Sequence, residues 1–240
     1  MRATLLALLL AAALGTPGRA AEAPAESDAL KPMVKSDSLV FNGITRSPDG
    51  RLFSPFQRQS KDTGLELGEW RDGKAVPFPD AAWNAWKLGD DPAKAFVAVN
   101  AIRIGPDGDL WVVDKGAPGM GAAPLPGGPK LVQIDLATNA VRKVYPLQAA
   151  TGEKSFIDDF RFNGSHIYLT DAGQPGLIVL DRETGGLRRV LDGHWSTIAQ
   201  RPLTGQGRVL RDDQGRLLFI HADQLEVSPD GKTFYYQACR

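Results

Sequence analysis

One pattern recurs four times after residue 40, and it constrains the fold more than any other feature of the chain. Each copy begins with Asn or Asp, continues as a short segment with alternating apolar residues, and then reaches Pro-Asp-Gly or Asn-Gly. Proline presets φ for a tight turn and glycine accepts a positive φ, so each copy predicts a β-hairpin. These turns fall at residues 48–50, 106–108, 163–164 and 229–231.

The spacing of the copies points to repeated sheets. Their first residues, Asn42, Asn100, Asp159 and Asp223, lie about 60 residues apart, a period with room for the four short strands of a β-propeller blade. A doubly wound α/β fold needs crossover helices, which the pattern lacks. A β-sandwich is the rival all-β fold, but sandwiches do not repeat at this period. The sequence therefore predicts an all-β propeller.

The number of copies is small for a closed propeller. A propeller closes when its last blade meets its first, because sheet edges otherwise stay exposed. The fourth copy, which begins at Asp223, is only half complete at Arg240. We therefore expect a chain that is truncated at its C-terminus, in which residues 38–240 form an incomplete propeller of about four blades.

The N-terminal residues read as a targeting segment. Arg2 is followed by an apolar run of Leu and Ala, and Gly18 and Ala20 supply the small residues that a signal peptidase requires. The run is too short to cross a bilayer, which takes about 20 residues. We expect residues 1–20 to be a signal peptide and residues 21–37 a flexible, polar, Pro/Ala-rich lead-in. The mature protein would then be exported, to the periplasm or the extracellular space.

Composition excludes several classes of protein. The 28 basic and 28 acidic residues cancel, so no net field attracts nucleic acid or an anionic membrane. The single cysteine, Cys239, rules out an internal disulfide and any CxxC metal site. No later segment is long and apolar enough to be a membrane span. A small-molecule ligand is the partner class that remains, and the sequence leaves the oligomeric state open.

The innermost strands of a propeller line its central channel. Equivalent residues of successive blades therefore form a ring, here predicted to consist of Asn42, Asn100, Asp159 and Asp223, with Asp158 beside Asp159. Oxygen donors without thiols or converging histidines suit a hard cation such as Ca²⁺, and Asn42, Asp159 and Asp223 are the candidate metal ligands. The alternative is structural, because Asn and Asp also cap turns by bonding to their own backbone.

Two further residue types bear on the channel. His221 precedes Asp223 by two residues, so the two side chains should share one face of a strand. His221 is therefore the histidine most suited to reach the channel. Trp83 or Trp111 could add an aromatic face for a cationic ligand.

Several segments resemble the major royal jelly/yellow protein family. They include Val99–Ile104, Gly108–Gly116, Pro129–Asn139 and Phe156–Phe160. The resemblance runs from about residue 38 onward and is most specific between residues 99 and 181. It implies a secreted, six-bladed propeller, and bacterial members are related to dopachrome-converting proteins and gluconolactonases.

The resemblance to gluconolactonase propellers also implies roles for individual residues. Those enzymes hold a divalent cation in the channel with Glu, Asn and Asp, and use an Asp as the base in lactone hydrolysis. Asn42 falls where they have the Glu, Asp158 or Asp159 at an Asn-Asp pair, and Asp223 at a metal-binding Asn. This chain departs from them in two ways: the first ligand is an amide, and the blade with the catalytic Asp is absent.

Three functions follow from these observations. The first is binding of a small molecule at the channel mouth, at Asn42, Asn100, Asp158, Asp159, His221 and Asp223, where an amine would be attracted by the acidic pair. The second is a metal-dependent lactone hydrolase, or a dopachrome-type isomerase, in which the metal polarises a carbonyl and activates water. The third is an envelope scaffold without a small ligand. The sequence does not decide whether the protein is an enzyme.

Overall fold

The computed structural model describes residues 31–56, 64–119, 121–212 and 214–239. It divides the chain into two units, Met1–Met33 and Val34–Arg240. In the first unit only residues 31–33 are described, and they belong to no helix or strand. The predicted signal peptide therefore lies outside the described residues, as does the lead-in as far as residue 30. All further description concerns the second unit.

The second unit contains three consecutive four-stranded antiparallel sheets, each a simple up-and-down meander. The first sheet comprises β1 (Thr45–Arg46), β2 (Leu52–Pro55), β3 (Leu67–Arg71) and β4 (Lys74–Pro77). The second comprises β5 (Val99–Ile104), β6 (Leu110–Asp114), β7 (Lys130–Asp135) and β8 (Ala140–Pro146). The third comprises β9 (Ile157–Asn163), β10 (His166–Asp171), β11 (Gly176–Asp181) and β12 (Leu187–Val190).

Shorter elements complete the described chain. A 3₁₀ turn, η1 (Gln148–Ala150), joins the second sheet to the third. A small hairpin of β13 (Thr204–Gly205) and β14 (Arg208–Val209) follows the third sheet. β15 (Ala222–Val227) and β16 (Phe234–Ala238) then pair as the first hairpin of a fourth sheet. No helix in the described residues is long and apolar enough to cross a membrane.

The predicted turns join the first two strands of each sheet. Their glycines Gly50, Gly108, Gly164 and Gly231 all have positive φ, between 58° and 98°. Glycine takes this conformation without steric cost, so the sequence closes each hairpin at the expected residues. The hairpin predictions are confirmed.

Two apolar cores lie between successive sheets. Phe53, Leu67 and Phe78 from the first sheet and its flank pack with Val112 and Val132 of the second. A second core joins Trp111, Leu131 and Tyr145 with residues of the third sheet such as Phe160 and Leu169. Successive sheets therefore stack face to face, as the blades of a propeller do.

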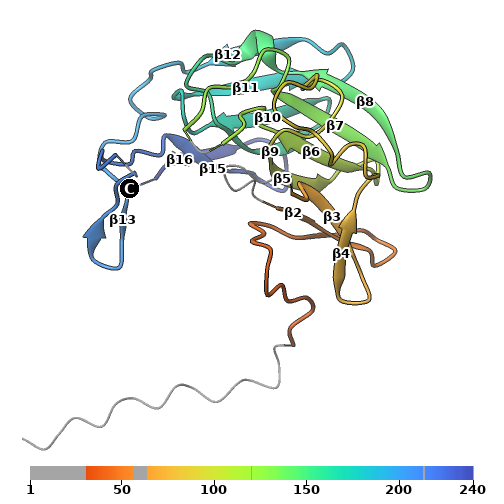
Figure 1. Ribbon diagram of the computed structural model, residues 1–240. Coiled ribbons are helices and arrows are strands. Elements are labelled where there is room, and N and C mark those ends of the chain that lie inside the picture. The colour runs from red at the N-terminus through yellow and green to blue at the C-terminus, as the bar shows by residue number, and fades with distance from the viewer. Residues whose placement is uncertain (1–30, 57–63, 120, 213, 240) are drawn as a thin grey trace, which may run out of the picture. The chain divides into compact units, whose positions relative to one another are not determined.

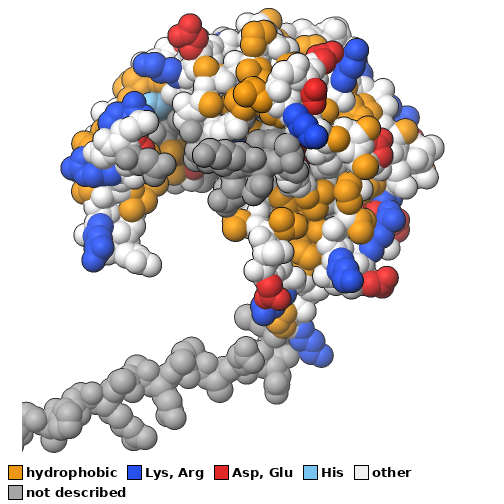
Figure 2. Space-filling view, viewed as in Figure 1, with side chains coloured by type: hydrophobic (Ala, Val, Ile, Leu, Met, Phe, Trp, Pro, Cys, Tyr) orange, Lys and Arg blue, Asp and Glu red, His pale blue; other side chains and the backbone are white. Residues whose placement is uncertain are grey.

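The inner strands of the sheets are neighbours in space. β5 contacts β1 and β9, and β9 in turn contacts β15; Figure 1 shows these strands in succession. The predicted all-β propeller-type fold is confirmed. The described residues contain three complete blades and the first hairpin of a fourth. On the face shown in Figure 2, acidic and basic side chains are interspersed, in keeping with the balanced composition.

Candidate functional site

The inner strands of the second, third and fourth sheets each contain a β-bulge at the same place. The residue before the bulge pairs with the last residue of the second strand, in the pairs Val99–Asp114, Ile157–Asp171 and Ala222–Ala238. In the first sheet the isolated bridge Phe41–Phe56 takes this position, ahead of β1. The residues that follow these paired residues are Asn42, Asn100, Asp158 and Asp223, called the polar ring below. Bulges re-aim side chains and are frequent beside active sites.

In the third sheet two adjacent carboxylates compete for the ring position. Asp158 follows the paired residue Ile157 and so corresponds to Asn42 and Asn100, whereas the sequence prediction set Asp159 in the ring with Asp158 beside it. Both residues lie in the bulge, between the paired residues Ile157 and Phe160.

Hydrogen bonds join the polar ring from sheet to sheet. Asn42 Nδ2 donates to the backbone oxygen of Asn100 over 3.0 Å, and Asn100 Nδ2 donates over 2.8 Å to both the backbone oxygen and Oδ1 of Asp158. Asp223 lines the same cavity as these three residues, and its proximity contributes to the raised pKa of Asp158. Asn42, Asn100 and Asp158, which are distant in sequence, thus form one connected polar chain.

The two asparagines present their carbonyl oxygens to a ligand. A backbone oxygen can only accept a hydrogen bond, so the atoms that bond to Asn100 O and Asp158 O must be the Nδ2 donors. In the described part of the chain no donor bonds to either Oδ1. Asn100 is buried, with an exposed fraction of 7%, and lines a cavity together with Asn42.

Asp158 holds its proton more tightly than an ordinary carboxyl group. Burial, then the nearby Asp223, raise the pKa of Asp158 to about 8, while the hydrogen bond from Asn100 acts in the opposite direction. Near neutral pH Asp158 is therefore mainly protonated. A positively charged ligand can replace this proton.

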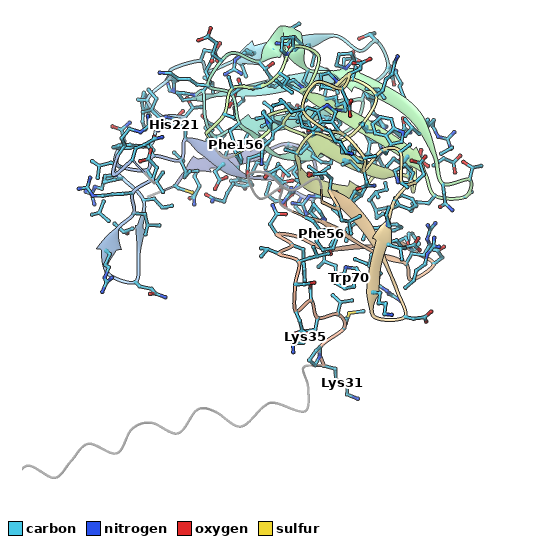
Figure 3. All side chains as sticks on the ribbon, viewed as in Figure 1. Lys31, Lys35, Phe56, Trp70, Phe156 and His221 are labelled. Carbon is cyan, nitrogen blue, oxygen red and sulfur yellow. The ribbon has the colours of Figure 1, made fainter. Side chains whose placement is uncertain are left out.

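Packing around the polar ring holds these residues in place. Phe41, beside Asn42, packs edge-on against Phe56 and Trp70, with ring centroids 6.1 and 5.5 Å away; Figure 3 labels Phe56 and Trp70. Thr170 Oγ1 donates to the backbone oxygen of Asp223 over 2.8 Å. Hence both ends of the ring are fixed by neighbours outside it.

A cavity of about 440 Å³ opens on the polar ring. All four ring residues line it, together with Phe156, Leu218, Phe219 and Ile220 on its apolar part. Apolar walls with a few convergent polar groups are typical of small-molecule sites. A ligand here would place a polar group on the ring and an apolar body against Phe156 and the 218–220 segment.

A smaller cavity of about 200 Å³ shares Asn42, Asn100 and Asp158 with the larger one and also reaches Asp159. The Asp159 carboxylate forms ion pairs with Arg103 and Arg161, and Arg161 in turn pairs with Glu226. Because its charge is already compensated, Asp159 is less suited than Asp158 to bind an added cation.

His221 does not line either of these two cavities. Its Nδ1 accepts a hydrogen bond from the backbone amide of Ala199 over 3.1 Å, and its own backbone amide donates to Ala172. Burial lowers the pKa of His221, while the charge of Asp171 opposes this shift. His221 thus supports the segment that enters β15; Figure 3 labels it together with Phe156.

Three residues near the site, Phe156, Lys115 and Cys239, were not among the predicted site residues. The aromatic face comes from Phe156, whereas Trp111 is buried in a core and Trp83 packs against another. Behind Phe156, the ammonium of Lys115 lies 4.6 Å from the ring centroid. Burial lowers the pKa of Lys115, opposed by nearby carboxylates that include Asp158.

Cys239 is the third of these residues. Its Sγ donates to Asp223 over 2.9 Å. Burial, followed by this hydrogen bond, raises the pKa of the thiol to about 11. The only sequence signal was the place of Cys239 in the repeat, where it corresponds to Lys115.

The donors of the polar ring are compatible with a hard cation. They are carboxylate and amide oxygens, which Ca²⁺ prefers. Among the described residues, however, no group of three or more His, Cys, Asp or Glu side chains is arranged to hold a metal. A metal at the ring would therefore depend on the amide oxygens of Asn42 and Asn100 as well as on Asp158 and Asp223.

The sheets and the polar ring between their inner strands define a propeller-type β protein with a central polar site. A family model described as major royal jelly protein matches residues 97–239. The chain belongs to the major royal jelly protein family. A search of curated proteins gave no match.

Solved structures with low sequence identity were also compared. The extracellular domain of BT4673 from B. thetaiotaomicron aligns with a TM-score of 0.47 at 13% identity, covering 82% of this chain and 19% of the other. Hydrazine synthase from Kuenenia stuttgartiensis aligns with a TM-score of 0.48 at 14% identity, covering 82% of this chain and 49% of the other. YCF48 from Cyanidioschyzon merolae aligns with a TM-score of 0.44 at 12% identity, covering 86% of this chain and 50% of the other. This chain thus spans half or less of each of these proteins.

Proposed function

We propose that the protein binds a small organic cation, with an ammonium group on the polar ring and an apolar body in the 440 Å³ cavity. The observation that carries the proposal is that the ring presents acceptors. The Nδ2 donors of Asn42 and Asn100 are used within the protein, and the carboxyl groups of Asp158 and Asp223 line the same cavity. An ammonium group supplies the N–H donors and the charge that such a set requires.

Benzylamine tests this proposal, since it joins an aromatic body to a primary ammonium. We expect benzylamine to bind at neutral pH and benzyl alcohol to bind at least about tenfold more weakly. The substitution Asp223→Asn should weaken benzylamine binding by about ten- to a hundredfold, because a hydrogen bond to a charged group contributes about 1.5–3 kcal/mol. Isothermal titration calorimetry measures all three affinities.

Asp37→Asn is the matched control, because Asp37 is exposed and lies outside the cavity. It should bind benzylamine as the unaltered chain does. Equal affinity for benzylamine and benzyl alcohol, or equal loss in the two Asp→Asn variants, would contradict the proposal.

The oxygen-only acceptors favour a second candidate, a metal-dependent lactone hydrolase. Asn42, Asn100, Asp158 and Asp223 would hold a divalent cation, which when bound would supply Lewis-acid polarisation of a carbonyl. Asp158, with its pKa of about 8, could hold or release a proton near neutral pH. Lactone hydrolysis that a chelator and Asp223→Ala both abolish would favour this candidate, whereas benzylamine binding that a chelator leaves unchanged favours the first.

We further propose that the protein is exported, on the basis of residues 1–20. Expression with the complete N-terminus in a secreting host should yield a chain that begins at Ala21, because small residues at 18 and 20 suit signal peptidase. Intact mass spectrometry measures the cleavage. The variant Ala20→Arg should stay uncleaved, whereas the control Ala25→Arg should be cleaved normally. If the unaltered chain keeps residues 1–20, export by this route is refuted.

A further inference from the structure

One member of the polar ring has a glycine after it. Asn42 precedes Gly43, and this dipeptide has a known chemical weakness. The backbone nitrogen of the second residue can attack the side-chain amide carbon of the asparagine, and glycine, which lacks a Cβ, hinders the approach least.

The surroundings of Asn42 leave this reaction open. Asn42 is exposed, and neither it nor Gly43 belongs to a strand. In the described part of the chain no hydrogen bond engages the backbone amide of Gly43. The attacking nitrogen is therefore not held in a sheet ladder, and the backbone can rotate toward the side chain.

The chain contains a second Asn-Gly pair that serves as an internal comparison. Asn163 and Gly164 form the turn between β9 and β10, and Asn163 is paired with His166. Both asparagines donate Nδ2 to a backbone oxygen, Asn163 to Gly231 and Asn42 to Asn100, so this bond does not distinguish them. Gly164, however, lies in the tight turn with a φ of 58°. Asn163 is also less exposed than Asn42. Its backbone is therefore fixed in a conformation that the cyclisation must disrupt.

We propose that Asn42 is a site of spontaneous deamidation, which converts the polar ring from two carboxyl groups to three. The Gly43 nitrogen forms a bond to Cγ of Asn42, the bond from Cγ to Nδ2 breaks, and ammonia leaves with the proton from the Gly43 nitrogen. Water then opens the resulting succinimide ring and regenerates a backbone peptide bond. The products are aspartate and isoaspartate at position 42.

The structure indicates what this change does locally. Asn42 Nδ2 is the donor that links the first sheet to the backbone oxygen of Asn100. A carboxylate at position 42 has no hydrogen to donate, so this link is lost at neutral pH. The cavity also gains a negative charge close to Asp158 and Asp223.

The effect on binding rests on the proposed function. If an organic cation binds at the ring, an aspartate at position 42 should tighten its binding by roughly tenfold through the added charge at close range. The chemical modification itself does not depend on that proposal. It can therefore be measured separately.

The first experiment follows the purified full chain during several weeks in mildly alkaline buffer. Peptide mass spectrometry reports deamidation as a gain of about one dalton, and an isoaspartate-specific methyltransferase confirms the isomer. We expect the Asn42 peptide to change at least about tenfold faster than the Asn163 peptide, because only Asn163 is fixed by strand pairing. Equal rates at the two sites, or a faster rate at Asn163, would overturn the proposal.

Gly43→Ala is the matched variant. A Cβ at residue 43 would meet Pro55 at 3.5 Å, an ordinary contact, so the substitution fits the fold. The added carbon should slow deamidation of Asn42 on the order of tenfold and leave the Asn163 rate unchanged. An unchanged Asn42 rate in this variant would contradict the cyclisation step.

The second experiment compares Asn42→Asp with the unaltered chain by calorimetry with benzylamine. Tighter binding supports a functional effect of the modification. If the unaltered chain binds no benzylamine, the proposed function fails and the deamidation result stands. If it binds and Asn42→Asp does not tighten binding, the functional effect of the modification is refuted while the proposed function stands.

Discussion

Replacing Lys130 with methionine is expected to lower the free energy of unfolding by about 3–5 kcal/mol, the cost of leaving one member of a buried ion pair without its partner. Lys130 Nζ lies 2.6 Å from Asp114 Oδ2, and the two side chains have exposed fractions of 1% and 0%. The ammonium also donates to the backbone oxygens of Pro92 and Gly128. Methionine has a similar length but satisfies none of these groups.

Asp114 makes this loss severe because it organises the start of the second sheet. Its carboxylate accepts hydrogen bonds from the backbone amides of Val97, Ala98 and Gly116. These bonds fix the chain just before Asn100. The third sheet repeats the arrangement, with Asp171 paired to Arg189.

Urea denaturation followed by tryptophan fluorescence measures the change. Lys74→Met is the control, because Lys74 is exposed at the turn between β3 and β4, and it should alter the midpoint very little. The double variant Asp114→Asn, Lys130→Met removes both charges and should be more stable than Lys130→Met alone. A midpoint for Lys130→Met equal to that of Lys74→Met would show that the buried pair is not needed.

Binding of benzylamine should tighten about tenfold for each pH unit between pH 6 and 8 and then level off. A primary alkylammonium group, like that of lysine, stays charged throughout this range, so the change reports the protein. The ammonium group competes with the proton of Asp158, whose pKa is about 8. Below that pH the protonated form dominates, and this proton must leave before Asp158 carries the negative charge that attracts the ligand.

Binding is expected to tighten with rising pH because the pKa of Asp158 is raised. A carboxyl group with its ordinary pKa near 4 would already be ionised at pH 6, and binding would then be flat over this range. Asp158→Asn should abolish the pH dependence and weaken binding at pH 8 to the level of the unaltered chain near pH 6. A flat profile in the unaltered chain, or weakening with rising pH, would show that Asp158 is not the group that titrates.

Local sequence patterns were sufficient to predict the repeated sheets. A turn at Pro-Asp-Gly or Asn-Gly depends on φ preferences of a few residues, so Gly50, Gly108 and Gly231 could be assigned without knowledge of the rest of the fold. The repeat period and the absence of helical periodicity then led to the propeller-type class. The family model matches residues 97–239, and this range includes residues 99–181, where the sequence resemblance is most specific.

The site was predicted less completely, since its geometry depends on register. Asn42, Asn100 and Asp223 were identified as equivalent, because a repeat preserves position along the chain. Both Asp158 and Asp159 were predicted as ligand residues; which of them aligns with Asn100 depends on a bulge that shifts the strand pairing, and sequence alone does not show which residue a bulge re-aims. The predicted metal and the ligand role of His221 stay predictions.

Interactions between near neighbours in the chain were predictable from residue patterns: the hairpins, their period and the residue types at each inner strand. How these residues meet depends on the folded chain. Asn42, Asn100 and Asp158 are linked by hydrogen bonds because successive sheets stack face to face. The raised pKa of Asp158 and the apolar wall from Phe156 and Ile220 arise from burial and contact between distant segments, which no local pattern encodes.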